Sequence, residues 1–231
     1  MTKASVIGFP AKSKKQRKAR KSGDGFKYLT DLQIKLLRRT ARDAAQLALQ
    51  KGQVTAVREW MLLDLLTCTG MREAEAADIR CGDLLAGYGQ CACYIRHGKG
   101  DKARTIEIPS SLRGHLKTFL AWKQGRGEPT GQDDHLFIGQ RGRWTPWAVG
   151  QIVKQHLRRL GLYEPGKSAH SMRHSYAVEL YRKKRDLRAV QKQLGHASVQ
   201  TTQKYADVLV EDIQGRIRET LREARRSGGR F

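Results

Sequence analysis

The sequence predicts a mainly helical domain with a small antiparallel β-sheet, an α+β fold. Apolar residues recur at helical spacing through most of the chain, and the period changes to that of strands only between residues 91 and 108. A length of 231 residues with 39% hydrophobic content is enough to bury one proper core. The sequence contains no internal repeat, so we expect one compact unit.

The first predicted elements are three helices. Thr30 is a good N-cap for a helix that runs to about Gln50, where Gly52 ends it. Its expected apolar positions are all leucines: Leu32, Leu36, Leu37, Leu47 and Leu49. Residues 60–66 are apolar nearly all round, which indicates a buried helix. A short helix over 72–79 follows.

The strands come next. Residues 91–96 and 104–108 have strand character, and the turn Gly98-Lys99-Gly100-Asp101 between them predicts a hairpin. Pro109 ends this sheet. Residues 136–138 are expected to form a third, short strand.

The remaining elements are helices. One begins at Ser110 or Ser111, after the predicted sheet. Another is opened by the cap and first-turn pair Thr145-Pro146 and stopped by Gly161. Four more are predicted, over residues 169–184, 187–194, 198–204 and 209–226.

The charge balance points to a polyanionic partner. Lys and Arg number 45 against 22 Asp and Glu, a net charge of +23. Such a field attracts nucleic acid, because each neutralised phosphate releases condensed counterions. An acidic membrane surface is the rival partner, but no long apolar run supports it. A merely soluble basic protein is the bland alternative.

The chain divides into three parts. Residues 1–25 are predicted to be a basic arm, without structure of its own, that orders against DNA phosphates; a solvated tail is the alternative. The arm's expected DNA contacts are Lys12, Lys14, Lys15, Arg17 and Lys18. Residues 26–208 are predicted to form the main folded domain, and residues 209–231 a C-terminal helix and tail.

The four cysteines predict neither a metal site nor disulfides. Cys91 and Cys93 form a CxC without a second pair at zinc-finger spacing. The basic N-terminus is followed by no apolar signal segment. We therefore expect reduced thiols in a cytoplasmic protein with no metal and no cofactor.

Two motifs in the first half of the chain suit phosphate binding. In TGMREAE (residues 69–75), Arg72 in a first helical turn is held by Glu75 three residues on, and a fixed guanidinium suits a phosphate. An ordinary surface ion pair is the alternative. In HGKGDKAR (residues 97–104), the turn offers Lys99 or Lys102 as a proton donor, with Arg104 beyond it as a DNA contact.

Two further motifs lie in the second half. In HSMRH (residues 170–174), His170 and Arg173 share a helical face and can hold one anion, while His174 competes with His170 for that role. In LGHASVQTTQKY (residues 194–205), a glycine re-aims His196, and Tyr205 follows in polar surroundings. A lone tyrosine is normally a packed or surface aromatic.

Taken together and in this order, the four motifs resemble those of the tyrosine recombinase (phage integrase) family, from about residue 28 to residue 207. The resemblance implies that residues 26–208 have the fold of that family's catalytic domain. The C-terminal helix over 209–226 either packs on this domain or, as in the family, docks on a neighbouring protomer. It implies a site-specific recombinase that cleaves and rejoins double-stranded DNA through a 3′-phosphotyrosyl link, without metal or ATP.

The resemblance also implies a role for each motif residue. Arg72 and Arg173 would clamp the scissile phosphate, and Tyr205 would be the nucleophile. His170 would be the acid–base partner, and Lys99 the general acid for the leaving 5′ oxygen. His196 would bind the phosphate or steer Tyr205, and Glu75 would support the site.

The sequence departs from the family by lacking most of the helical DNA-clamping domain that usually precedes the catalytic one, as in minimal recombinases. We expect a homotetramer in the synaptic complex, and a monomer in free solution is the open alternative for the unbound protein. The gene is expected to belong to a bacterium, phage or plasmid. A topoisomerase-like relaxing enzyme and a non-catalytic DNA-binding regulator are the alternative functions.

Overall fold

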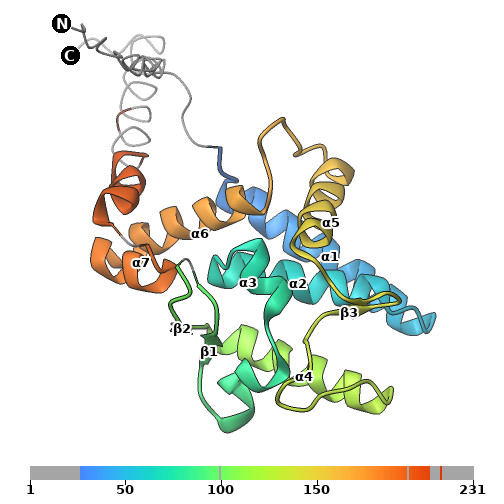
Figure 1. Cartoon of the computed structure of the whole chain (residues 1–231). Coiled ribbons are helices and arrows are strands. Elements are labelled where there is room, and N and C mark those ends of the chain that lie inside the picture. The colour runs from blue at the N-terminus through green and yellow to red at the C-terminus, as the bar shows by residue number, and fades with distance from the viewer. Residues whose placement is uncertain (1–26, 99, 197, 209–213, 215–231) are drawn as a thin grey trace, which may run out of the picture.

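The computed structural model describes residues 27–98, 100–196, 198–208 and 214. Within them the chain is mainly helical with two small antiparallel sheets, which confirms the predicted fold class (Figure 1). The predicted arm over residues 1–25 and nearly all of the segment 209–231 lie outside the described residues.

Helix α1 (Asp31–Gln50) begins as predicted. The Thr30 hydroxyl accepts a hydrogen bond from the backbone N–H of Gln33, whose side chain accepts one from the backbone N–H of Thr30. The predicted apolar face is wrong for four of its five leucines. The helix buries Leu37 with three alanines, and the leucines that face outward are Leu32, Leu36, Leu47 and Leu49. The small alanine side chains allow close packing against α2.

Helix α2 (Thr55–Thr69) is buried on nearly every side, as predicted, because α1, α4 and α6 all pack against it. Its buried Asp64 accepts hydrogen bonds from the Arg38 guanidinium of α1 and lies 2.8 Å from His115 Nδ1 of α4 (Ser110–Gly125). A buried charge needs such partners. Gly70, in the left-handed conformation with φ 64°, ends α2, and α3 (Glu73–Asp78) follows at once.

The predicted hairpin forms from β1 (Ala92–Ile95) and β2 (Arg104–Glu107), with Cys93 opposite Ile106. Both of these side chains are buried. The third strand does not join this sheet. Instead β3 (Ile138–Gly139) pairs with β4 (Gly142–Arg143) in a second sheet, because a tight turn folds the chain back on itself there.

The C-terminal helices are α5 (Pro146–Arg159), α6 (Ala169–Lys184) and α7 (Leu187–Leu194), and residues 199–208 are also helical. In Figure 1, α6 and α7 lie together, with the hairpin beside α7. A second, smaller core joins these helices: Ala177, Val178, Val190, Leu194 and Tyr205. The helix over 199–208 is therefore packed on α6 and α7 through Tyr205.

Candidate active site

The buried carboxylate of Glu75 organises one side of the site. Its Oε1 accepts hydrogen bonds from Arg72 Nη1 at 2.6 Å and from Arg104 Nη1 at 2.9 Å. Its Oε2 accepts one from the Arg72 backbone N–H and one from Arg104 Nη2, both at 2.9 Å. Arg104 thus binds the carboxylate with both arms of its planar fork, and this ties the start of β2 to the start of α3.

Arg72 was predicted to lie in the first turn of a helix, but it lies at the N-cap of α3, one residue before the helix begins. The backbone of Arg72 is extended, so its N–H lies at the end of the helix without a partner inside it. The side chain of Glu75, the third residue of α3, accepts the hydrogen bond from this N–H. A Cβ atom at Gly70 would lie 2.6 Å from Cδ1 of Tyr176. The sharp turn that aims Arg72 therefore needs a glycine for space as well as for its φ angle.

Glu75 stays ionised in this setting. Burial alone would raise its pKa, but the hydrogen bonds and charges of Arg104 and Arg72 lower the pKa to about 2. A permanently charged carboxylate holds two guanidinium groups in fixed positions. Arg72 is consequently oriented before any ligand arrives.

Arg173 joins three segments of the chain from within the protein. Its Nη1 donates to the Gly70 carbonyl at 2.7 Å and its Nη2 donates to the Leu194 carbonyl at 2.6 Å. Burial, followed by the charge of Arg72, lowers the pKa of Arg173 to about 10, so the group remains cationic at neutral pH. It connects the end of α2, the helix α6 and the end of α7.

The two arginines converge on the C-terminal end of α7. Arg72 Nη2 lies 3.5 Å from the Gly195 carbonyl, next along the chain from the Leu194 carbonyl that Arg173 binds. Gly195 has a φ of 66°, and a Cβ atom there would lie 2.8 Å from Arg104 Nε. Two guanidinium groups directed at adjacent carbonyls can bind one anion, and their planar forks suit a phosphate.

Tyr205 lies between two histidines. His174 Nδ1 is 3.1 Å from the Tyr205 hydroxyl oxygen. The His196 ring stacks on the Tyr205 ring, with centroids 6.1 Å apart and planes 20° apart. His196 Nδ1 is itself 3.1 Å from the hydroxyl of the fully buried Thr202. The phenol therefore contacts His174 through its hydroxyl group and His196 through the face of its ring.

Burial sets the protonation of all three groups. It lowers the pKa of His174 and of His196 to about 4, and neighbouring cations add to the effect. Burial raises the pKa of Tyr205, although Arg173 and Arg72 act in the opposite direction. At neutral pH the site therefore holds two neutral imidazoles and a protonated phenol.

The structure brings together five of the predicted residues: Arg72, Glu75, Arg173, His196 and Tyr205. His170 is exposed on α6, and its ring meets the His174 ring edge to face at 5.7 Å. Lys102 is exposed beyond the hairpin turn. Lys99 lies outside the described residues, as do the predicted contacts of the arm: Lys12, Lys14, Lys15, Arg17 and Lys18.

Two residues have positions that differ from their predicted roles. Arg104, expected to contact DNA, is 13% exposed in its side chain and is bound to Glu75. The sequence carries no signal for this pairing across 29 positions. His174, considered only as a rival to His170, contacts the tyrosine hydroxyl. The sequence did contain a signal for this contact, because His174 is the second histidine of the HSMRH motif.

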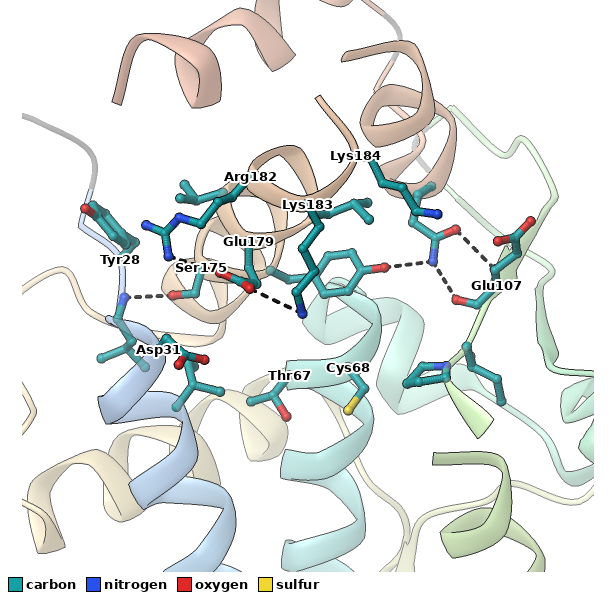
Figure 2. Close-up of a pocket in the computed structure, with 18 of the residues that line it drawn as sticks. Tyr28, Asp31, Thr67, Cys68, Glu107, Ser175, Glu179, Arg182, Lys183 and Lys184 are labelled. Carbon is teal, nitrogen blue, oxygen red and sulfur yellow. Dashed lines mark hydrogen bonds and ion pairs between the residues drawn. The ribbon is translucent and has the colours of Figure 1, made fainter. Parts of the chain in front are cut away.

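A cleft of about 1710 Å³ lies between α1, α2, β2, α6 and α7, apart from most of these residues. Figure 2 shows Glu179 and Lys183 paired in it and the Ser175 hydroxyl facing the start of α1, where it accepts from the Leu29 N–H. Of the site residues, Arg104 lines it. The cleft therefore adjoins the site at Arg104.

In the described part of the chain, no group of three or more His, Cys, Asp or Glu side chains could hold a metal ion. Cys91 is exposed and the other three cysteines are buried, all as free thiols. Of the helices among these residues, none is both long and apolar enough to cross a membrane.

A tyrosine beside two histidines and two arginines, on a mainly helical domain with a β-hairpin, defines the class of tyrosine recombinase catalytic domains. The family model described as "Phage integrase family" matches residues 27–212, and the chain belongs to this family.

Similar proteins agree with this assignment. Tyrosine recombinase XerC of Herpetosiphon aurantiacus is 35% identical over 164 residues, 71% of this chain and 52% of that protein. Tyrosine recombinase XerC of Rhodospirillum centenum is 33% identical over 202 residues, 84% and 57% of the two chains. The chain therefore spans about half the length of the curated relatives it matches.

Solved structures show the same fold. The XerH site-specific recombinase in a pre-cleavage complex with its difH substrate has a TM-score of 0.65 at 27% identity, over 81% of this chain and 52% of that one. The XerA recombinase has a TM-score of 0.66 at 25% identity, over 83% and 65% of the two chains.

Proposed function

We propose that this chain is a site-specific DNA recombinase that cleaves and rejoins double-stranded DNA with Tyr205 as its nucleophile. The observation that carries the proposal is the position of Tyr205, with its hydroxyl at His174 and its ring on His196, in the field of Arg173 and Arg72. Membership of the family supports the same conclusion.

In this reaction the Tyr205 oxygen attacks the scissile phosphorus, and the bond from phosphorus to the 5′ oxygen breaks. The product is a 3′-phosphotyrosyl link with a free 5′ hydroxyl. The covalent link conserves the phosphodiester energy, so rejoining needs no ATP. Arg72 and Arg173 stabilise the charge that develops on the phosphoryl oxygens, and they do so without reorganisation because their positions are fixed beforehand.

The other predicted roles remain part of the proposal. Glu75 holds Arg72 in place. His196 contacts the phosphate or steers Tyr205, and Lys99 protonates the leaving 5′ oxygen. His170, exposed one turn before His174, is the acid–base partner that the family resemblance implies.

We extend the proposal to the assembly. The net charge of +23 supports binding to the DNA backbone, and the basic segment 1–25 adds further phosphate contacts. Strand exchange between two sites requires four protomers, so we propose a tetramer on DNA. The setting is the cytoplasm of a bacterium, with a bacterial, phage or plasmid gene.

A covalent-adduct assay tests the function. The probe is a nicked duplex that carries the inverted repeats flanking the gene, so that the cleaved strand diffuses away and the adduct accumulates. Wild type should form the adduct, and Tyr205→Phe should form none while still binding the DNA. Absence of an adduct with wild type on this duplex, together with binding, would support a non-catalytic regulator. Relaxation of supercoiled DNA that lacks the repeats would support a topoisomerase-like enzyme.

A further inference from the structure

Three ionised side chains form one cluster at the start of α3: Glu75, Arg72 and Arg104. One carboxylate and two guanidinium groups give this cluster a net charge of +1. The side chain of Glu75 is 2% exposed, that of Arg104 13% and that of Arg72 21%, so Arg72 is the most open of the three to a ligand. Because water screens buried charges poorly, each charge in the cluster acts strongly on the other two.

Arg104 is directed at the carboxylate and enclosed on its other sides. Its Nη1 donates to Glu75 Oε1 and its Nη2 to Glu75 Oε2, each at 2.9 Å. Its flank lies along the turn after α7, where a Cβ atom at Gly195 would be 2.8 Å from Arg104 Nε and 3.0 Å from Cζ. A Cβ atom at Gly98, in the hairpin turn, would be 3.0 Å from Arg104 Nη1. The guanidinium group is therefore held between the hairpin, α3 and the end of α7.

Arg72 binds the same carboxylate in a more open way. Its Nη1 donates to Glu75 Oε1 at 2.6 Å, whereas its Nη2 lies 3.5 Å from the Gly195 carbonyl. That second contact is longer than an ordinary hydrogen bond from nitrogen to oxygen, about 2.7 to 3.2 Å, so Nη2 can exchange it for a phosphoryl oxygen. If Glu75 and Arg72 were alone, however, their charges would cancel, and the pair would attract an anion only weakly.

We propose that Arg104 is a positioning residue that offsets the negative charge of Glu75, so that Glu75 orients Arg72 without cancelling the positive charge that Arg72 offers to the scissile phosphate. Arg104 acts through Glu75 in this role and does not itself contact DNA. The inference rests on the proposed function, because it adds a residue to the group that holds the phosphate in that reaction.

The electrostatics of the site support this role. Burial raises the pKa of Glu75, and the hydrogen bond from Arg104 has the next largest effect, which is to lower that pKa. Burial also lowers the pKa of Arg173 and of His196, and Arg104 is one of the nearby cations that lower both further. Arg104 therefore keeps Glu75 ionised and adds to the positive potential where the phosphate is expected.

Single-turnover cleavage of the nicked duplex described above, with a phosphodiester or an uncharged methylphosphonate at the scissile position, tests the proposal. Arg104→Gln keeps a hydrogen-bond donor for Glu75 but removes the charge. It should cleave the phosphodiester about 10- to 100-fold more slowly than wild type. The methylphosphonate needs less cationic stabilisation, so the two proteins should cleave it at rates within about threefold of each other. Equal losses on the two substrates would overturn the proposal, because they would indicate a purely structural role.

Two further variants separate charge from structure. Arg104→Lys keeps the charge and should cleave the phosphodiester faster than Arg104→Gln; equal rates would contradict the proposal. The matched control is Arg96→Gln. Arg96 lies on the same hairpin and donates to the buried carboxylate of Asp83 at 2.7 Å, a pair that includes neither arginine of the site among the described residues. It should lose stability but cleave both substrates at wild-type rates. A loss confined to the phosphodiester in Arg96→Gln, as large as that in Arg104→Gln, would refute a special role for Arg104.

Binding to the methylphosphonate duplex distinguishes this role from a direct contact with the DNA backbone. A residue that acts only through the scissile phosphate has no effect on affinity once that phosphate is uncharged. Arg104→Gln should therefore bind this duplex as wild type does. Weaker binding, with a dependence of log K on log salt that is smaller by about 0.9, would show that Arg104 contacts another phosphate and would overturn the proposal.

A measurement without DNA keeps this inference distinct from the proposed function. The free protein is titrated with inorganic phosphate and the NMR signals of the Arg72 guanidinium group are followed. Arg104→Gln should bind phosphate about tenfold more weakly than wild type, and Arg96→Gln should bind it equally well; equal binding by all three proteins would refute the inference. If wild type forms no adduct, the proposed function fails and this titration still decides the role of Arg104. If wild type forms the adduct and Arg104→Gln cleaves as fast, only the present inference fails.

Discussion

Replacing Glu75 by glutamine removes one negative charge from between two guanidinium groups and leaves the volume nearly unchanged. The carboxylate side chain is 2% exposed and accepts four hydrogen bonds from Arg72 and Arg104. Glutamine offers one acceptor oxygen, and its amide NH2 group is a hydrogen-bond donor that faces two cations. Glu75→Gln therefore weakens both the folded state and the orientation of Arg72.

The magnitude follows from the pKa. A pKa lowered from 4.5 to about 2 corresponds to about 3 kcal/mol of folding free energy contributed by the ionised form. Because the pKa is depressed, this contribution is complete above pH 4.5 and is lost as the pH falls towards 2. The difference between wild type and Glu75→Gln should therefore be about 3 kcal/mol at pH 7 and about half of that at pH 3.

Urea unfolding at the two pH values measures both differences. The matched control is Glu73→Gln, which changes the first residue of the same helix. The Glu73 carboxylate takes part in none of the ion pairs among the described residues. Its loss should stay below about 1 kcal/mol, the usual size of a helix-dipole effect. A Glu75→Gln loss under 1 kcal/mol at pH 7, or one that does not shrink at pH 3, would refute the reasoning.

Two backbone positions give further expectations. Gly195→Ala should lose about 1 to 2 kcal/mol of folding free energy, because alanine is strained at the left-handed φ of 66°, and it should cleave DNA more slowly, because the new Cβ displaces Arg104. The control Gly161→Ala has the same φ but open space around it, so urea unfolding should show a loss of stability without a loss of cleavage. Equal cleavage by the two variants would contradict the role of Arg104. Arg185→Gly should raise the free energy of unfolding by about 0.5 to 1 kcal/mol, since Arg185 ends α6 at a φ of 54°; a lower melting temperature would count against it.

The sequence predicted the local features well. The cap at Thr30, the buried helix α2, the hairpin and the cap at Thr145 depend on residues close together in the chain, and the structure confirms them. The face of α1 was misjudged because large leucines were expected to point inward. The helix instead buries Leu37 and the alanines that let it approach α2 closely.

The site was harder to derive from sequence, because its contacts join distant segments. Nothing local shows that Arg104 turns back to Glu75, or that backbone carbonyls at the end of α7 bind both arginines. His174 and His170 lie one helical turn apart with the same chemistry. The packing of the helix over 199–208 against α6 and α7 decides which of them meets Tyr205.

The membership of Tyr205 in the second core has a consequence for how the protein is made. A ribosome releases the chain from its N-terminus, so both arginines, Glu75 and the histidines emerge before the tyrosine. Tyr205 then reaches its partners only by packing beside Val190 and Leu194. A nascent or truncated chain can carry the arginine pair without the proposed nucleophile. The proposed DNA cleavage is thereby withheld until the helices that surround the tyrosine have been synthesised and assembled.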